Sequence, residues 1–145
     1  MNMDMGWLAK ELRIYPLTDK QRRALETVFK VEFVPKDMPI IHQGTLVRNL
    51  YLLRSGSVRI VRRNGSREVI LGVSKKSRTF GEIRFFGDEP ASANVISETP
   101  SELYSLSCEN FQWLMKNHAD VAMKLMAYIL RSMGEVIRSM DNAKH

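Results

Sequence analysis

The strongest constraint on the fold is a central series of short segments that are rich in β-branched and aliphatic residues and are separated by turn residues. Between two of these segments stands Asn64-Gly65, a pair that favours a tight hairpin because both residues accept positive φ at little cost. Short strands at this spacing predict a β-sandwich or jelly roll. The predicted strands cover residues 31–34, 40–42, 50–54, 57–63, 68–73, 94–98 and 102–106.

Helical periodicity flanks this region on both sides. Thr18 and Gln21 form a capping-box pattern, and Pro16 ends the apolar spacing that precedes it. We predict an α+β fold that is mainly β: a jelly-roll barrel over 31–107 with N-terminal helices in 1–30 and C-terminal helices in 108–145. The predicted helices cover residues 7–15, 19–29, a segment after 107 and, beyond a break at 117–119, a long helix that ends near 140.

Length and cysteine content limit the classes of protein. A chain of 145 residues predicts one domain, here 1–145. Cys108 is the only cysteine, which excludes an intrachain disulfide and a multi-cysteine metal site and suits a reducing compartment. The longest apolar run, Leu125 to Leu130, is far below the roughly 20 residues of a spanning helix. With no signal-peptide pattern at the start, we expect a cytoplasmic protein without membrane insertion.

The positive charge is concentrated in one part of the chain. Residues 48–84 carry a formal charge of +8, although the whole chain carries +6. Such a patch could bind the phosphates of nucleic acid or an anionic surface. The alternation of Val58, Arg59 and Ile60, however, indicates a strand that simply presents arginine to solvent, and few aromatic residues are interleaved. Nucleic-acid binding therefore remains an alternative that no sequence motif supports.

The long C-terminal helix has two apolar faces. On one of them Met126, Met133 and Met140 are seven residues apart and interleave with Ile129 and Val136, which is a heptad pattern. Methionine stripes also fill cores, and this one covers fewer than three heptads. Since one helix on a small barrel cannot bury both faces within its own domain, we predict a homodimer through these five residues. The other face contains Val121, Leu125 and Ile137.

The order of elements and several motifs resemble the cyclic nucleotide-binding domain of catabolite-activator-type regulators and of protein kinase A regulatory subunits. The resemblance covers nearly the whole chain. It rests on Ile40-Ile41-His42-Gln43-Gly44, on Leu50-Tyr51-Leu52-Leu53-Arg54-Ser55-Gly56-Ser57-Val58, on Phe80-Gly81-Glu82-Ile83 as the start of a phosphate-binding cassette, and on Pro90-Ala91-Ser92-Ala93-Asn94-Val95 as its end.

A pocket for a cyclic phosphodiester needs backbone N–H groups, a guanidinium and a carboxylate for the ribose hydroxyl. Glu82 is a candidate for the carboxylate, although a carboxylate at a helix start also serves as a cap. Gly81 lets the backbone approach the ligand, and the Ser92 hydroxyl is a further donor. The candidate ligand-binding residues are Gly81, Glu82, Ile83, Arg84, Ala91, Ser92 and Ala93.

The cassette departs from the family pattern at one decisive position. The resemblance implies an arginine directly after the cassette proline, and here Ala91 follows Pro90. Removing one side of a buried charge pair typically costs about 2–5 kcal/mol, which is roughly thirtyfold to a few thousandfold in affinity. Arg84 is an alternative source of a guanidinium for the phosphate. The simpler interpretation is that the Arg84 side chain is solvated. Ser77 also replaces a glycine that is usual in the family at a turn.

No catalytic pattern is present. His42, His118 and His145 have neither an i, i+4 ligand partner nor a nearby nucleophile, and Cys108 is a lone thiol. Five residues follow Met140, whereas a helix-turn-helix reader needs roughly 20. We therefore expect a non-enzymatic regulatory or scaffolding module without a cofactor, with a degenerate cassette and an unidentified protein partner. The alternatives are a stand-alone cyclic AMP or cyclic GMP sensor and binding of nucleic acid or an anionic surface through the basic strands.

Overall fold

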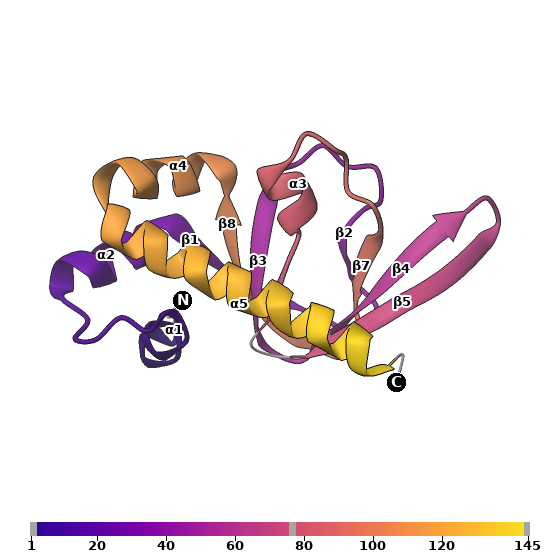
Figure 1. Ribbon diagram of the computed structural model, residues 1–145, viewed down its shortest axis with the longest axis horizontal. Coiled ribbons are helices and arrows are strands. Elements are labelled where there is room, and N and C mark those ends of the chain that lie inside the picture. Colours follow the sequence, from indigo (N-terminus) through magenta and orange to yellow (C-terminus); the bar gives the residue numbers. More distant parts are fainter. Residues whose placement is uncertain (1–2, 76–77, 144–145) are drawn as a thin grey trace. The chain divides into compact units, whose positions relative to one another are not determined.

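The computed structural model describes residues 3–75 and 78–143, and the side chains of 75, 83 and 136–143 are not described. Its contacts divide the chain into two compact units (Figure 1). A helical unit contains residues 1–29 and 109–145, and a β unit contains residues 30–108. The bounds of the β unit lie one residue outside those of the predicted barrel at each end.

The β unit is a jelly roll of two four-stranded sheets, in the orders β1-β8-β3-β6 and β2-β7-β4-β5. This confirms the predicted fold class. The strands are β1 (Phe29–Val34), β2 (Pro39–Ile41), β3 (Asn49–Ser55), β4 (Ser57–Asn64), β5 (Arg67–Lys75), β6 (Arg78–Phe80), β7 (Asn94–Ser97) and β8 (Ser101–Ser107), with the short helix α3 (Glu82–Phe86) between β6 and β7.

The core of the β unit lies between the two sheets. Tyr51 and Leu53 are two residues apart on β3 and therefore point to the same face of their sheet. Tyr51 and Phe80 are register partners on β3 and β6, and their rings stack with centroids 5.1 Å apart. The cluster consists of Tyr51, Leu53, Phe80 and Leu103 from one sheet and Val58 and Val95 from the other.

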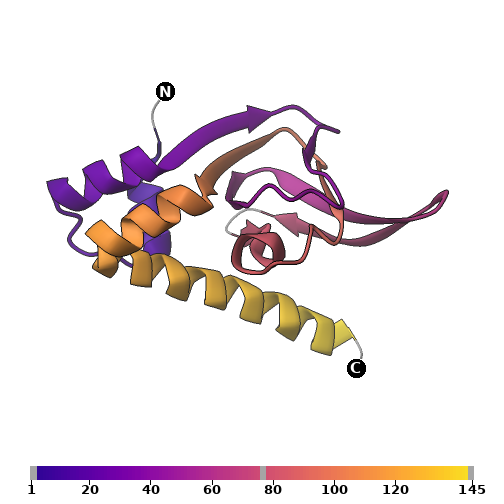
Figure 2. The ribbon, with the colours of Figure 1, turned by 90° about the horizontal axis from the view of Figure 1, so that it is seen from above.

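The predicted hairpin is the β4–β5 pair, which reaches beyond the other strands of its sheet in both views (Figures 1 and 2). Asn64 is still paired, with Arg67, so the turn residues are Gly65 and Ser66 rather than Asn64 and Gly65. Gly65 has φ +63°, as the turn requires. Of the eight strands in residues 3–75 and 78–143, the sequence predicts seven and misses β6.

The helical unit contains α1 (Met5–Leu12), α2 (Asp19–Val28), α4 (Cys108–Asn117) and α5 (Ala119–Ala143). The Thr18–Gln21 capping box is formed in both directions. The break before the long helix falls at His118, as predicted. Side-chain hydrogen bonds join these helices: Gln21 donates to Asp120 at 3.0 Å, Asn110 donates to the Val28 carbonyl at 3.1 Å, and Arg131 donates to the Glu11 carbonyl at 3.2 Å. None of the helices in the described part of the chain combines the length and apolarity that a bilayer crossing requires.

Candidate functional site

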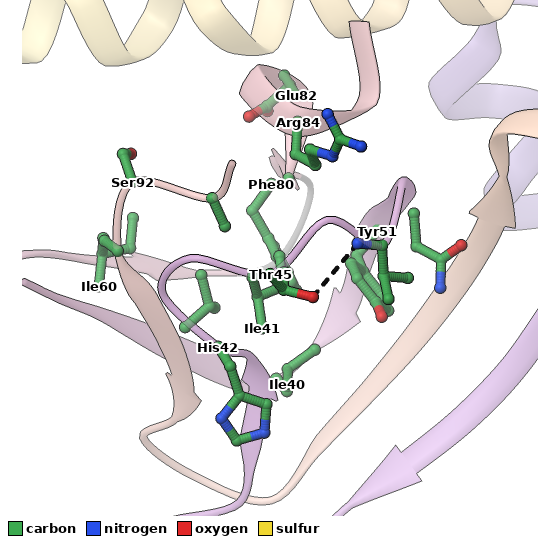
Figure 3. Close-up of a pocket in the computed structure, with 16 residues that line it drawn as sticks. Ile40, Ile41, His42, Thr45, Tyr51, Ile60, Phe80, Glu82, Arg84 and Ser92 are labelled. Carbon is green, nitrogen blue, oxygen red and sulfur yellow. Dashed lines mark hydrogen bonds between the residues drawn. The ribbon is translucent and has the colours of Figure 1, made fainter. Parts of the chain in front are cut away.

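A cavity of about 260 Å³ lies within the β unit, beside α3 (Figure 3). Apolar side chains from both sheets form most of its wall, because it continues the inner face of the barrel. Polar and charged groups come from α3, from the segment before β7 and from the loop after β2. The lining residues are Ile40, Ile41, His42, Thr45, Val47, Asn49, Tyr51, Ile60, Phe80, Gly81, Glu82, Arg84, Ala91, Ser92, Ala93 and Val95.

The structure brings most of the predicted cassette to this one cavity. Gly81, Glu82 and Arg84 line it from the start of α3, and the segment before β7 contributes the residues at 91–93. The side chain of Ile83 lies outside the described residues. Two segments, 81–84 and 91–93, thus face the same space, as the resemblance implies.

Gly81 is required by its backbone conformation and by a close neighbour. Its φ is +91°, and a Cβ built on it would lie 2.7 Å from the carbonyl oxygen of Asn49 on β3. A side chain at this position therefore meets backbone that cannot easily move. The start of α3 is consequently held directly against β3.

Arginines fix α3 to the loop that precedes β3. Arg48 donates from Nη2 to the Phe85 carbonyl at 2.9 Å and from Nε to the Arg84 carbonyl at 3.3 Å. Arg84 in turn donates from Nε to the Leu46 carbonyl at 2.8 Å. The two bonds from Arg48 satisfy carbonyl groups at the end of a short helix, which have no partner within the helix. The role of Arg48 was not predicted from the sequence, because its acceptors lie more than 30 residues away.

Glu82 is bound by its own segment of chain. The Thr79 hydroxyl donates to Glu82 Oε1 at 2.5 Å. Burial raises the pKa of Glu82, and the hydrogen bond from Thr79 partly opposes that rise. The carboxyl group therefore has a structural partner before any ligand arrives.

Ala91 is tied into the wall of the cavity by its backbone. Its N–H donates to the Thr45 carbonyl at 3.1 Å, and its carbonyl accepts from the Gly44 N–H at 2.8 Å. Only a methyl group is left to face the cavity. Among the described residues that line the cavity, Arg84 carries the one guanidinium (Figure 3).

Several lining residues were not among the sequence candidates. In the sequence Ile40 and Ile41 belong to a motif and Ile60 belongs to a predicted strand. The sequence does not predict that any of the three lines a cavity. The Tyr51–Phe80 ring pair also faces the cavity. The inward positions of a barrel strand can be inferred from alternation, so this signal was present in the sequence.

The predicted helix seam agrees with the structure only in part. Met133 is 41% exposed and Met126 is half-buried, whereas Ile129 is 1% exposed and has almost no surface to offer a partner. The exposed neighbour is Leu130, at 63%. The difference arises because packing within the chain decides which face of α5 is buried. The spacing of the apolar residues alone does not decide this. The side chains of Val136 and Met140 lie outside the described residues.

The basic segment is partly neutralised by its own neighbours. Arg59 Nη1 pairs with Asp37 at 2.9 Å and with Glu98 at 3.2 Å, and Arg63 pairs with Glu68 at 2.9 Å.

In residues 3–75 and 78–143 no group of three or more His, Cys, Asp or Glu side chains is arranged to hold a metal ion. Cys108 is half-buried at the start of α4.

Comparison with known proteins decides the family. The protein-family model described as "Cyclic nucleotide-binding domain" matches residues 31–118, more than half of the chain. The chain belongs to the cyclic nucleotide-binding domain family. The matched range includes every residue that lines the cavity.

Two of the curated relatives carry cyclic AMP in their names. The chain is 31% identical over 114 residues to a cyclic AMP receptor protein of Thermus thermophilus, a match that covers 78% of this chain and 53% of that protein. It is 29% identical over 110 residues to the cAMP-activated global transcriptional regulator CRP of Pasteurella multocida, covering 74% and 53%. The chain thus spans about half the length of these curated relatives.

Solved structures show the same fold. The catabolite activator protein of Thermus thermophilus matches with a TM-score of 0.68 and 28% identity, over 92% of this chain and 63% of that one. A cyclic nucleotide-binding domain from Methylobacillus flagellatus matches with a TM-score of 0.78 over 90% of this chain and 76% of that one. At 16% identity, this second match shows the fold alone.

Proposed function

We propose that this chain is a non-enzymatic regulatory or scaffolding module whose cassette binds cyclic nucleotides too weakly for signalling, and which acts through protein contacts. The observation that carries the proposal is Ala91. It follows the cassette proline, where the family resemblance implies an arginine, and it offers the cavity a methyl group. A cyclic phosphodiester entering there meets an apolar wall at the point where its charge needs a partner.

The remaining groups only partly replace that clamp. Arg84 lines the cavity, but its Nε is used by the Leu46 carbonyl, so the side chain is anchored from the loop side. A guanidinium held in this way keeps its two Nη groups for an anion. The bidentate bond of a freely placed arginine is harder to form when one edge of the fork is already bonded.

The carboxylate for a ribose hydroxyl is also weakened. The Thr79 hydroxyl occupies one oxygen of Glu82, and burial favours the protonated form. One oxygen of this carboxyl group therefore already accepts a hydrogen bond before a ribose hydroxyl arrives. Both polar anchors of a nucleotide are therefore compromised in the same cavity.

Protein contact through α5 is part of the proposal. Met123, Met126, Leu130 and Met133 follow the 3-4-3 spacing of a coiled-coil seam. Three of them are among the exposed apolar side chains of the chain, and Met126 is half-buried. A second copy of this helix would cover such a stripe, so we propose a homodimer with this corrected seam.

A stand-alone cyclic-nucleotide sensor is the second candidate function. It is favoured by one observation: Glu82, Arg84 and Ser92 all line the same cavity. In this alternative the Nη groups of Arg84 would replace the missing arginine.

Calorimetric titration with cyclic AMP and cyclic GMP separates the two functions. The module proposal predicts a dissociation constant weaker than about 30 µM, since loss of the clamp moves a micromolar ligand by roughly thirtyfold or more. A constant of about 1 µM or tighter overturns it. If Arg84→Ala then abolishes that binding, while Arg22→Ala, on an exposed position of α2, leaves it unchanged, the sensor function is established instead.

A further inference from the structure

The β4–β5 hairpin leaves one edge of its sheet open. β5 is the last strand in the order β2-β7-β4-β5 and pairs with β4 from Arg67 to Lys75. Among the described residues, no strand covers its other side. An open edge presents a row of backbone N–H and C=O groups that can pair with another chain.

This edge lacks the charges that usually protect an open strand. Residues 69–73 contain neither charge nor proline. Four apolar side chains on it are 47–66% exposed, namely those of Val69, Ile70, Leu71 and Val73. A bulge places Leu71 between the pairs Val61–Ile70 and Ile60–Gly72, and the ladder continues on both sides of it. The centre of the edge is therefore apolar, and a bulge at Leu71 lies within it.

Charge is placed at the two ends of the strand. Arg67 begins β5, and the register puts Lys75 at its other end. The one acidic residue of the strand, Glu68, is paired with Arg63 at 2.9 Å. The open edge thus has an apolar centre between two basic ends.

This arrangement disfavours a second copy of the same strand. Antiparallel pairing of two β5 strands around Leu71 would place Arg67 opposite Lys75 at both ends. Like charges directly opposite each other destabilise a strand pair. A strand with carboxylates at its ends would instead gain ion pairs at the same positions.

We propose that the open edge of β5 binds an extended acidic segment of another protein, which adds as a further strand with its apolar residues along 69–73 and its carboxylates at the basic ends. Main-chain hydrogen bonds supply the affinity in this mode of recognition, and side chains set the specificity. The proposal goes beyond the function proposed above, because it does not depend on what the cavity binds.

A labelled nine-residue peptide, Glu-Asp-Val-Thr-Val-Thr-Val-Glu-Asp, tests this with the full chain, by fluorescence anisotropy and by amide chemical shifts. We expect saturable binding that perturbs the amides of residues 67–75. Arg67→Glu should weaken it about fivefold, because an exposed ion pair is lost and a repulsion of similar size is introduced. Arg22→Glu makes the same charge change on an exposed position of α2 and should alter binding less than about twofold.

Two altered peptides keep the test independent of protein folding. Methylating the alternate backbone nitrogens on one edge should abolish binding, and so should replacing the four acids by lysine. The proposal is overturned if the methylated peptide binds equally well, since attraction would then be purely electrostatic. It is also overturned if the perturbed amide chemical shifts belong to residues outside β5. A third contrary result is that an oligothymidylate of twelve nucleotides binds this edge and the peptide does not.

Discussion

Replacing Gly81 by alanine tests how closely the cassette is held against β3. At φ +91°, the new Cβ would lie 2.7 Å from the Asn49 carbonyl oxygen and 3.2 Å from Cδ1 of Ile41. A left-handed conformation costs alanine about 1–2 kcal/mol, and relieving the clash with backbone adds about 1–3 kcal/mol, as overpacking does. We expect Gly81→Ala to lower the free energy of unfolding by roughly 2–5 kcal/mol.

Gly44→Ala is the matched control. Gly44 has φ +87°, almost the same backbone conformation, and a Cβ there meets no atom within 4 Å. Its substitution should therefore cost only the backbone part, about 1–2 kcal/mol. The difference in the free energy of unfolding between the two variants therefore measures the cost of the close approach of residue 81 to β3.

Urea unfolding followed by far-ultraviolet circular dichroism is the appropriate assay. Trp7 and Trp113 both lie in the helical unit, so tryptophan fluorescence does not report directly on the barrel. Equal midpoints and slopes for Gly81→Ala and Gly44→Ala would refute the claim that the cassette is packed against the β3 backbone.

Three further predictions concern charge and assembly. Burial raises the pKa of Glu82 above its ordinary value of 4.5, so the stability that the protonated carboxyl group contributes is complete below that pH and is lost as the pH rises through the raised pKa. Glu82→Gln, which cannot titrate, should therefore flatten the fall in melting temperature as the pH rises above 4.5, and an unchanged slope would contradict this. Leu130→Glu should give a monomer by light scattering while Lys124→Glu, on an exposed position of the same helix, keeps the dimer; equal masses for both variants would remove the seam. Arg59→Ala should lower the melting temperature more at low salt than at high salt, because it removes ion pairs with Asp37 and Glu98, and a salt-independent loss would show that packing rather than charge is involved.

The strands that the sequence predicts well are those with their own turn chemistry. The positive φ expected at Gly65 is found, and β4 and β5 pair on either side of the turn. Burial along β4 does not alternate strictly, since Val58 and Val61 are both buried. β6 was missed because Arg78-Thr79-Phe80 has no strand pattern of its own and becomes a strand by pairing with residues 51–53. Pairing of this kind depends on partners distant in the sequence, which propensity does not contain.

The candidate site, like the fold, can be predicted from the sequence only in part. The motif around Gly81 and the absence of arginine at position 91 can be read from the sequence. The direction of Arg84 cannot, since it is set by the Leu46 carbonyl, 38 residues away. On α5, seven-residue spacing predicts that Ile129 is exposed, but Ile129 is buried within the chain and its neighbour Leu130 is exposed. Spacing identifies apolar faces, and packing decides which of them is left exposed.

The affinity of an Ala91→Arg variant for cyclic AMP, measured by calorimetry beside the unaltered chain, tests the central claim most directly. If loss of the clamp is what disables the cassette, restoring it should tighten binding at least roughly thirtyfold, the lower end of what a buried charge partner contributes. The same dissociation constant for both proteins would contradict the account, because the residue after the cassette proline would then not determine whether a nucleotide is held.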